Sequence, residues 1–521
     1  MRLATVLVLF LALPASAQIV VNSTNDVLGD EGNCTLREAL RAANTDTASG
    51  ATPGECAAGS GADAIVISVA PGSTIALQED LPAVTESISL EGPTGLADGV
   101  TIDGRGQHRI FELDSNGLQQ THTLRGLTIT RGMASAGGGI LVGFQDDCVF
   151  ENLAVVRNVA ENAGGGIFTG PEGMCEMNRV NVSDNEVQNF AGGGGIRLGN
   201  SGSATIRNST IANNRALQSG GGGILVGFFA LPEATFVLEQ STVSGNSAAG
   251  GGGGIAQVGS NGTSIIRAST IVGNSITGTA SAGGGVSFSA PLTMESTIVA
   301  GNTAERGSGE WNDLSLGNNN TTSNGGNVIG INGFFDDEFP LGEPNAGGDK
   351  VGNEAMPLDA LLAGLRDNGG PMRTHLPRAN SPVLDAGVCP GFPADQRGSI
   401  REVDETNISD RNGDACDSGA VEGRTFVVGT ERDPIAGIAL DAPVPNPMRG
   451  GAQVVYALDT PQVVRLSLVD ARGRELAVLI EGAQAAGEHG VALPSGLAPG
   501  VYLLRLGTEA GAVTQRVTVV R

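Results

Sequence analysis

The side chains with the clearest potential for chemistry form a short acidic stretch toward the C-terminus. Asp410, Asn412, Asp414 and Asp417 follow a D-x-N-x-D-x-x-D spacing, which places four oxygen-bearing side chains close together, as calcium loops do. Ala415 stands where such a loop usually has glycine, and no glutamate follows at the usual closing position. The stretch therefore predicts either a calcium site or a polar turn.

The six cysteines form three local pairs that predict disulfides. An even number of cysteines in an exported chain favours disulfide bonds over free thiols. Zinc ligation is the alternative, but the sequence has no CxxC or HxxxH spacing and only four histidines. The expected pairs are Cys34 with Cys56, Cys148 with Cys175, and Cys389 with Cys416.

The first residues predict that the protein is exported. Arg2 precedes an apolar run to Leu13, and the small residues Ala15 to Ala17 then provide a cleavage site, which is the pattern of a secretory signal over residues 1–17. We expect the mature chain to begin at Gln18, outside the cytoplasm or on the outer cell surface. No later stretch is long and apolar enough for a transmembrane helix.

Composition excludes one class of partner. The chain has 521 residues, with 55 acidic and 30 basic side chains, and its formal net charge is -25. Nucleic-acid binding needs clustered lysine and arginine, so we expect no nucleic-acid partner. Glycine is abundant at 81 residues without a three-residue period, and 40% of residues are hydrophobic, which disfavours collagen and disorder.

A repeat of about 30 residues occupies the middle of the chain. Three glycines followed by Ile or Val recur with spacings of 27, 29, 28, 31 and 31 residues. Each unit holds short apolar strands without helical periodicity and is too small to bury a core alone, so the units must stack into a solenoid. A flexible linker is the alternative, but a linker would not keep an apolar residue in phase. The tetrads end at Ile140, Ile167, Ile196, Ile224, Ile255 and Val286.

Two further residue types keep the phase of the repeat. Cys148 lies eight residues after Ile140 and Cys175 eight residues after Ile167, so stacking predicts that these cysteines meet on adjacent coils, with Cα atoms about 5 Å apart. Asparagines also recur at one corner, where they tolerate left-handed backbone angles and can form a hydrogen-bonded ladder. The expected ladder is Asn158, Asn185, Asn214, Asn246, Asn274 and Asn302.

These patterns predict an all-β protein. We expect a right-handed parallel β-helix of about nine or ten coils over residues 62–330. A terminal segment with alternating apolar residues follows a linker at 424–442 and predicts a small all-β domain over residues 443–521, which a family resemblance given below implies to be an immunoglobulin-like β-sandwich.

Three segments resemble known families of exported bacterial proteins. The motif CTLREAL at 34–40 resembles the CSLREA domain, which implies an N-terminal cap over residues 18–61. The motifs DNGGPMRTH at 367–375, NSPVLDAG at 380–387, DQRGSIR at 395–401 and CDSGAVE at 416–422 resemble the choice-of-anchor Q region, which implies a C-terminal cap over residues 331–423. Ser418 stands where that family often has Ile.

The last segment resembles a type IX secretion sorting domain. Its motifs are PVPNP at 443–447, VVYAL at 454–458, LVDARGREL at 468–476 and GLAPGVYLLRL at 496–506. This resemblance implies that the type IX secretion machinery is a partner. It also implies export across the outer membrane, followed by surface attachment or release.

The repeat contains no set of catalytic residues that we expect to act together, so we assign none. A hydrolase on this fold, like a pectate-lyase-type enzyme, needs carboxylates or a base converging from neighbouring coils. One coil after Asp146 and Asp147 stand Gly173 and Met174, and the column of Asp184 holds Arg157 and Asn213. Arg179 and Arg207 are the candidate lyase bases.

We therefore expect a non-catalytic protein that binds an extracellular polysaccharide, another surface or an ion, with calcium as the cofactor to test. A polysaccharide lyase or glycoside hydrolase is the alternative, because the fold does not decide between the two functions.

Overall fold

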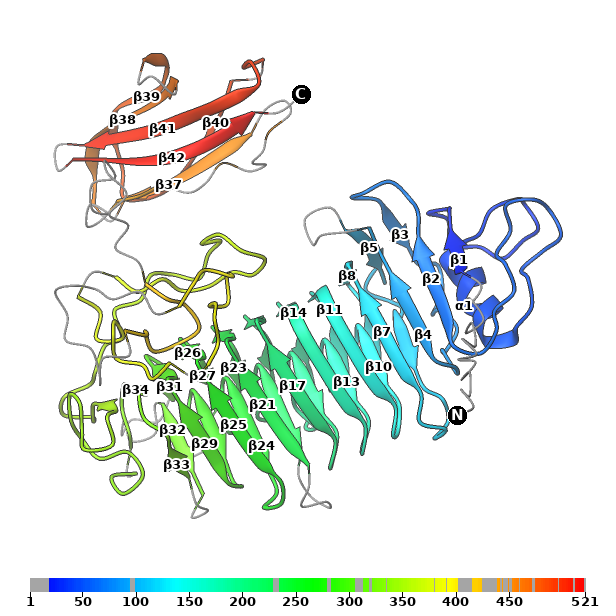
Figure 1. Ribbon diagram of the computed structural model, residues 1–521, viewed down its shortest axis with the longest axis horizontal. Helices are drawn as coiled ribbons and strands as arrows, with labels where there is room; N and C mark the ends of the chain where they lie inside the picture. Colours follow the sequence, from blue (N-terminus) through cyan, green and yellow to red (C-terminus); the bar gives the residue numbers. More distant parts are fainter. Residues whose placement is uncertain are drawn as a thin grey trace, which may run out of the picture. The chain divides into compact units, whose positions relative to one another are not determined.

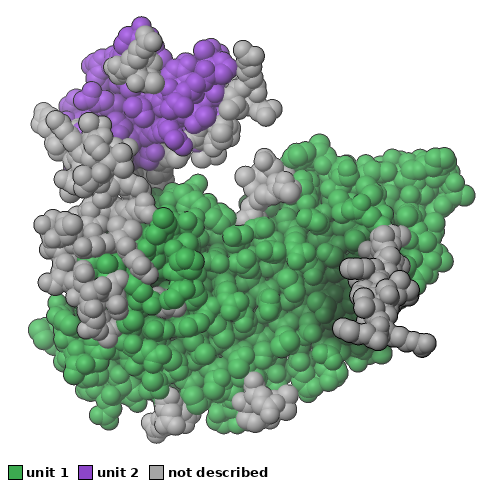
Figure 2. Space-filling view, in the orientation of Figure 1, with its two compact units in different colours: residues 1–423 green, residues 424–521 purple. Residues whose placement is uncertain are grey.

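The computed structural model divides the chain into two compact units, Met1–Gly423 and Arg424–Arg521, which are coloured separately in Figure 2. The structure describes residues 18–93, 99–227, 234–278, 283–304, 313–317, 321–333, 335–378, 380–389, 391–401, 415–423, 438–440, 443, 448, 452–458, 460–470, 474–494, 496–508 and 511–519. The predicted signal at 1–17 lies outside this range.

Unit 1 is a parallel β-solenoid of about nine turns built from three sheets, and each turn from β7 to β32 contributes strands to all three (Figure 1). Sheet B contains β6 (Phe111–Leu113), β10 (Ile140–Val142), β13 (Ile167–Thr169), β16 (Ile196–Leu198), β20 (Ile224–Gly227), β24 (Ile255–Val258), β28 (Val286–Phe288) and β32 (Leu314–Leu316). Sheet C contains β9 (Met133–Ala136), β12 (Val159–Ala163), β15 (Glu186–Val187), β19 (Arg215–Ala216), β23 (Ser247–Ala248), β27 (Ser275–Ile276) and β31 (Thr303–Ala304).

Sheet A is the largest sheet and has two ranks of strands separated by a bend. The first rank contains β1 (Gln18–Val21), β2 (Asp63–Ile67), β4 (Ile88–Glu91), β7 (Thr121–Arg125), β17 (Ser203–Arg207), β21 (Thr235–Glu239), β25 (Thr263–Arg267), β29 (Leu292–Glu295) and β33 (Thr322–Ser323). The second rank contains β3 (Thr74–Ala76), β5 (Val100–Asp103), β8 (Leu127–Thr130), β18 (Thr210–Ala212), β22 (Thr242–Ser244), β26 (Thr270–Val272), β30 (Ile298–Ala300), β34 (Val328–Ile329) and β35 (Lys350–Val351). The long strands β11 (Asp147–Val156) and β14 (Met174–Ser183) cross both ranks.

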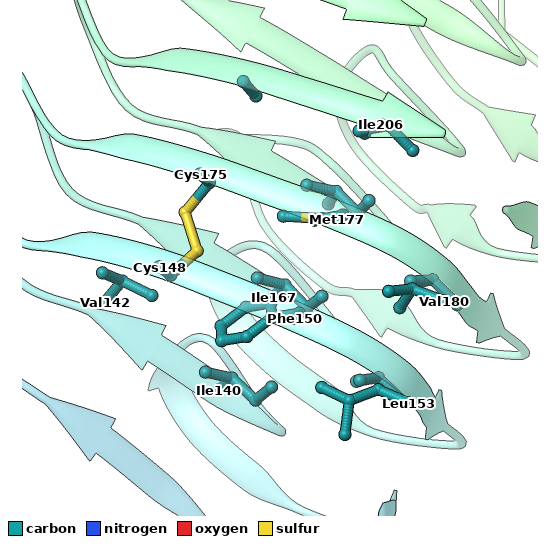
Figure 3. Packing of buried hydrophobic residues seen from close by; sticks show 14 of the residues in the cluster. Ile140, Val142, Cys148, Phe150, Leu153, Ile167, Cys175, Met177, Val180 and Ile206 are labelled. Atoms are coloured by element: carbon teal, nitrogen blue, oxygen red, sulfur yellow. A yellow bond between two sulfur atoms is a disulfide. The ribbon is translucent and has the colours of Figure 1, made fainter. Parts of the chain in front are cut away.

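The apolar core fills the inside of the turns because side chains alternate along each strand. The residue that closes each glycine tetrad begins a sheet B strand, and Ile140, Ile167 and Ile196 are in register and fully buried. Across the turn, Phe150 and Met177 point toward the same core from sheet A (Figure 3). This stacking confirms the prediction that the repeat buries its apolar residues in columns.

The ladder asparagines lie at the corner between sheets A and C. Each side-chain Nδ2 donates to the Oδ1 of the asparagine one coil later, for example from Asn158 to Asn185 at 3.0 Å and from Asn214 to Asn246 at 2.9 Å. The backbone N–H of Asn214 donates to the same oxygen of Asn246 at 2.9 Å. The ladder continues through Asn274 to Asn302.

The left-handed residue at this corner is not the ladder asparagine itself, as the sequence had suggested, but the residue before it. Arg157, Asp184 and Asn213 have φ values of 57°, 58° and 57°. The left-handed angle turns the chain just before the ladder position. The asparagine that follows can then point inward, where its amide is fully shielded from water.

The structure contains all three expected disulfides. Cys148 and Cys175 are directly paired residues of β11 and β14, with Cα atoms 4.5 Å apart (Figure 3). The repeat phase therefore placed this bond correctly. The other two bonds lie in the segments before and after the repeat.

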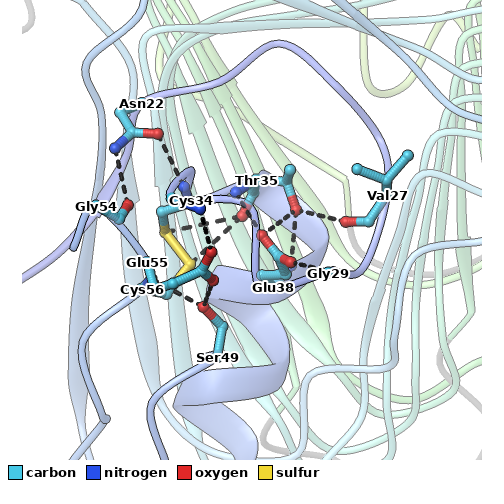
Figure 4. The surroundings of a disulfide bond; sticks show 11 residues. Asn22, Val27, Gly29, Cys34, Thr35, Glu38, Ser49, Gly54, Glu55 and Cys56 are labelled. Carbon is cyan, nitrogen blue, oxygen red and sulfur yellow. Dashed lines mark hydrogen bonds between the residues drawn. A yellow bond between two sulfur atoms is a disulfide. The ribbon is translucent and has the colours of Figure 1, made fainter. Parts of the chain in front are cut away.

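The helix α1 (Leu36–Thr45) packs against β1 and β2 and adds Leu36 and Leu40 to the end of the core. Thr35 caps the helix: its backbone N–H donates to Glu38 at 3.0 Å, and the N–H of Glu38 donates to its hydroxyl at 3.2 Å (Figure 4). The Cys34–Cys56 disulfide ties the start of this helix to the following loop.

The sheet extends one strand beyond the predicted solenoid at each end. β1, within the predicted cap at 18–61, pairs in parallel with β2. β35, beyond residue 330, pairs in parallel with β34. Past β34, Phe339 is fully buried against the same apolar core and closes its C-terminal end.

Unit 2 consists of antiparallel sheets, consistent with a small β-sandwich. One sheet contains β36 (Ile438–Leu440), β37 (Gln453–Leu458) and β40 (Gly487–Ala492), and the other contains β38 (Gln462–Asp470), β39 (Glu475–Gln484), β41 (Gly500–Thr508) and β42 (Gly511–Val519). β36 falls within the predicted linker at 424–442 and pairs with β37, so the sheet begins before residue 443.

Candidate functional site

The first rank of sheet A presents an outer face on which side chains align in rows along the solenoid. Ser89 stands opposite Thr123, and Thr123 opposite Val149, so equivalent outward residues of successive strands form a middle row. The side chains of this row are half-buried or exposed. The row consists of Ser89, Thr123, Val149, Glu176, Thr205, Val237, Ile265 and Thr293.

A row of charged residues runs beside the middle row, on the side of the bend. Its members alternate between acidic and basic over most of its length: Glu91, Arg125, Glu151, Asn178, Arg207, Glu239, Arg267 and Glu295. Arg125 pairs with Glu151 at 2.8 Å, and Arg207 pairs with Glu239 at 2.6 Å. These carboxylates therefore neutralise arginines of adjacent strands.

Glu239 shows that this row is structural. Burial alone would raise the pKa of the Glu239 carboxyl, but hydrogen bonds from Arg207 and Arg267 hold that pKa below its ordinary value. Its side chain is 2% exposed. A catalytic carboxylate must be accessible to a substrate. Glu239 is buried and paired with two arginines, so a substrate cannot reach it.

A shallow hollow opens on the other side of the face, over β2, β4 and β7. Its volume is about 350 Å³. Small residues create it: Ala64, which is paired with Ser89 and so begins the middle row, leaves space above the sheet together with Ser89 and Thr123. The lining consists of Ala62, Asp63, Ala64, Ser87, Ile88, Ser89, Thr121 and Thr123.

On β11 and β14, the strands beyond β7, positions equivalent to those of the hollow carry larger side chains. Asp147 is paired with Thr121, and its Oδ1 accepts the backbone N–H of Met174 at 2.7 Å. Met174 is 61% exposed, and Glu176 is exposed beside it. Phe144 lies in the turn that leads into β11 and is 46% exposed. The hollow thus continues into a surface with carboxylate and apolar side chains.

The outer face of the second rank, by contrast, is covered by described residues between 358 and 423. The hydroxyl of Thr210 donates to the carbonyl of Arg373 at 2.7 Å, and the hydroxyl of Thr242 donates to Gln396 at 2.6 Å. Val383 packs in an apolar cluster with residues of β26, β30 and β34. From β18 onward, this face is part of the protein interior.

The covering segment contains a buried charged cluster. Arg401 and Glu422 lie 3.5 Å apart, and both side chains are fully shielded from water. Asp395 pairs with Arg397 at 2.7 Å. Burial, followed by the neighbouring Glu422, raises the pKa of Asp417 well above its ordinary value. Arg401, Asp417 and Glu422 are buried, and their contacts hold the described part of the segment together.

Of the predicted calcium ligands, only Asp417 lies among the described residues. Its carboxylate accepts backbone N–H groups of Asp385, at 2.8 Å, and Gly423. Asp410, Asn412 and Asp414 lie outside the described residues. In the part of the chain that the structure describes, no three His, Cys, Asp or Glu side chains are grouped as metal ligands.

The other polar candidates from the sequence are separated. Asp146 is buried and accepts the backbone N–H groups of Ser115 and Gln120, each at 2.8 Å, so its role is to hold a turn. Arg207 is paired with Glu239. Arg179 is exposed at the bend between the two ranks, and Asp184 is exposed at the corner between sheets A and C.

Sequence reasoning missed the hollow, although Ser87, Ser89, Thr121 and Thr123 carry a signal. Both pairs alternate with buried residues, and the second pair flanks His122, which is fully buried. Only the register between β4 and β7 brings the two pairs together.

Two comparisons bear on what the protein is. Residues 115–334 match the family model described as a right handed beta helix region. No curated protein matches the chain. Among the described residues, no helix is long and apolar enough to cross a membrane. With its stacked parallel sheets and this match, the protein is a right-handed β-helix protein.

Proposed function

We propose that this protein is an exported β-helix that binds an extracellular polysaccharide along the outer face of the first rank without cleaving it. The observation that carries the proposal is the contrast between the two ranks of sheet A. From β18 onward the second rank is covered by described residues between 358 and 423, whereas the side chains of the middle row of the first rank stay half-buried or exposed. An open face beside a covered one favours an external ligand.

The regular spacing of the face suits a polymer. Successive members of a row are one strand spacing apart, about 4.8 Å, so a chain lying along the solenoid axis meets one side chain of a row on every strand. Threonines and serines recur in the middle row and in the neighbouring outward row, which contains Thr121, Ser203, Thr235 and Thr263. A hydroxyl can both donate and accept a hydrogen bond. The face therefore offers repeated polar contacts to a repeating ligand.

The state of the carboxylates supports a non-catalytic role. Glu151 and Glu239 are paired with arginines, and Asp146 is buried in a turn. One observation favours the alternative, a glycoside hydrolase or lyase: Asp147 and Glu176 lie on adjacent strands of the open face, diagonally across from one another. Two carboxylates on neighbouring coils are the minimum for hydrolysis.

Export belongs to the same proposal. The separate antiparallel unit after residue 423 is consistent with a sorting domain, and its sequence resembles the type IX kind. We propose delivery to the outer cell surface or the medium by that machinery. Calcium bound by Asp410, Asn412, Asp414 and Asp417 remains part of the proposal. Calorimetry tests it, because the heat of calcium binding must disappear after Asp410→Ala and Asp414→Ala.

Co-sedimentation of the mature protein with insoluble polysaccharides, with and without calcium, tests binding and cleavage together. We expect depletion of the protein from solution, with no new reducing ends and no absorbance from unsaturated products. Depletion without products supports the non-catalytic function, and released products would establish the alternative. Retention of all protein in solution would refute both.

A further inference from the structure

We infer that the hollow over β2, β4 and β7 is a binding site for an uncharged, hydroxyl-rich glycan. The inference rests on the proposed function and narrows its ligand from polysaccharides in general to neutral ones. It also places the contact at one end of the first rank.

The first argument is the state of the hydroxyls in the hollow. Ser87 donates its hydroxyl to Gln120 at 2.5 Å and accepts the backbone N–H of Thr121 at 3.1 Å, so it is already used. The hydroxyls of Ser89, Thr121 and Thr123 have no protein partner among the described residues. Ser89 and Thr123 stand directly opposite one another. Free hydroxyls at fixed spacing can donate to and accept from sugar hydroxyls.

The second argument is the charge around the hollow. None of its lining residues, all of which the structure describes, is basic, and Asp63, which is 2% exposed, is the acidic residue among them. Glu86 directly precedes Ser87 of the lining. Burial, Asp46 and Asp63 together raise the pKa of Glu86, so these neighbouring carboxylates repel one another. Asp147 and Glu176 follow along the rows. The nearest arginine of the first rank, Arg125, is paired with Glu151.

The negative charge around the hollow favours neutral glycans over acidic ones. A polymer of uronic acids would bring carboxylates beside unneutralised carboxylates, and like charges repel. A neutral sugar has no such cost, and its hydroxyls can donate to Asp147 and Glu176, because an ionised carboxylate only accepts. The exposed side chains of Met174 and Phe144 add apolar surface for the carbon–hydrogen faces of sugar rings.

Native electrophoresis in gels that contain a dissolved polysaccharide tests the site. The gels would contain hydroxyethylcellulose, galactomannan or arabinoxylan as neutral polymers and polygalacturonate as the acidic one. The proteins are the full mature chain, Thr121→Arg and Thr263→Arg. Thr121 and Thr263 are exposed in the same outward row, but Thr263 lies five strands beyond the hollow, so its variant carries the same charge change as a control.

We expect at least one neutral polymer to retard the wild-type protein and the Thr263→Arg variant, whereas polygalacturonate retards neither. Thr121→Arg, which fills the hollow, should weaken retardation at least tenfold, and far-ultraviolet circular dichroism verifies that it is folded. Equal retardation of the two arginine variants, or retardation of the wild type by polygalacturonate, would overturn the assignment of the hollow. No retardation by any polymer would overturn the proposed function itself.

Discussion

Oδ1 of Asp313 accepts two hydrogen bonds from Asn302, one from the side-chain Nδ2 at 2.8 Å and one from the backbone N–H at 2.9 Å. Every asparagine of the ladder donates toward the next coil, so the last position receives donors and needs only to accept. Asp313 meets this requirement because its Oδ1 accepts both bonds. Asp349 ends a second column in the same way, by accepting from Asn327 at 2.9 Å.

The ladder should be a major source of stability. Asn246→Ala removes the acceptor for two donors of Asn214 and the donor to Ile211, and leaves these groups buried without partners. Each such group costs about 1–3 kcal/mol, so we expect a large fall in the midpoint of thermal unfolding.

The control for the ladder is Asn162→Ala. Asn162 donates to Ser135 at 2.9 Å on the exposed surface of sheet C, where water can replace the lost bond. We expect this variant to change the free energy of unfolding by less than about 0.5 kcal/mol. Equal effects of the two substitutions, measured by scanning calorimetry, would show that the buried ladder contributes no more than a surface contact.

The carboxyl of Asp313 should make stability fall as the pH rises from about 4 to 7. Burial raises its pKa from 3.8 to about 7, although Asn302 and Ile331 donate to it. In this window the folded protein keeps a proton that the unfolded chain has lost, so raising the pH favours unfolding, by up to about 1.4 kcal/mol per pH unit. Asp313→Asn removes this ionisation.

Thermal unfolding of the wild type and Asp313→Asn at several pH values measures the effect. We expect the melting temperature of the wild type to decline relative to that of the variant between pH 4 and 7. A difference that stays constant over this range would mean that Asp313 ionises as readily in the folded protein as in the unfolded chain.

His122 should have the opposite pH dependence. Burial lowers the pKa of its imidazole, and Asp146, whose Oδ1 lies 4.0 Å from Nε2, only partly opposes this. Below about pH 6.5 the unfolded chain takes up a proton that the folded ring resists, so stability is lost as the pH falls. His122→Phe should therefore unfold at a higher temperature relative to the wild type at pH 5 than at pH 7. A wild-type protein that loses no stability relative to the variant on acidification would contradict this.

The sequence was sufficient to predict what depends on the repeat phase. Residues at equal offsets stack on neighbouring coils, so Cys148 and Cys175 could be paired before the structure was known. The same argument located the ladder asparagines, because each coil repeats the same corner.

The features that the sequence did not reveal depend on contacts without a period. Thr210 and Arg373 are 163 residues apart, and nothing near either residue indicates that they meet. β1 has four residues and lies in the segment 18–61 that the CTLREAL resemblance assigns to a cap, so the pattern did not predict that it joins the sheet. The hollow required the register between Ser89 and Thr123, which pattern alone does not determine.

Delivery to the surface or the medium should require unit 2. Truncation before Ala442 removes the motifs that resemble a sorting domain and leaves unit 1, a separate compact body, intact. We expect circular dichroism of the truncated protein to show a folded β-structure, while cell fractionation finds no protein at the surface or in the medium. Surface delivery of the truncated protein would refute the role proposed for the removed domain.

The most direct test of the account is to incubate the mature protein with the neutral polysaccharide that retards it most and to follow the mixture by size-exclusion chromatography with light scattering. The account predicts that protein and polymer elute together and that the mass of the polymer is unchanged after prolonged incubation. Separate elution, or a polymer mass that falls with time, would contradict the proposal that this β-helix binds a glycan without cleaving it.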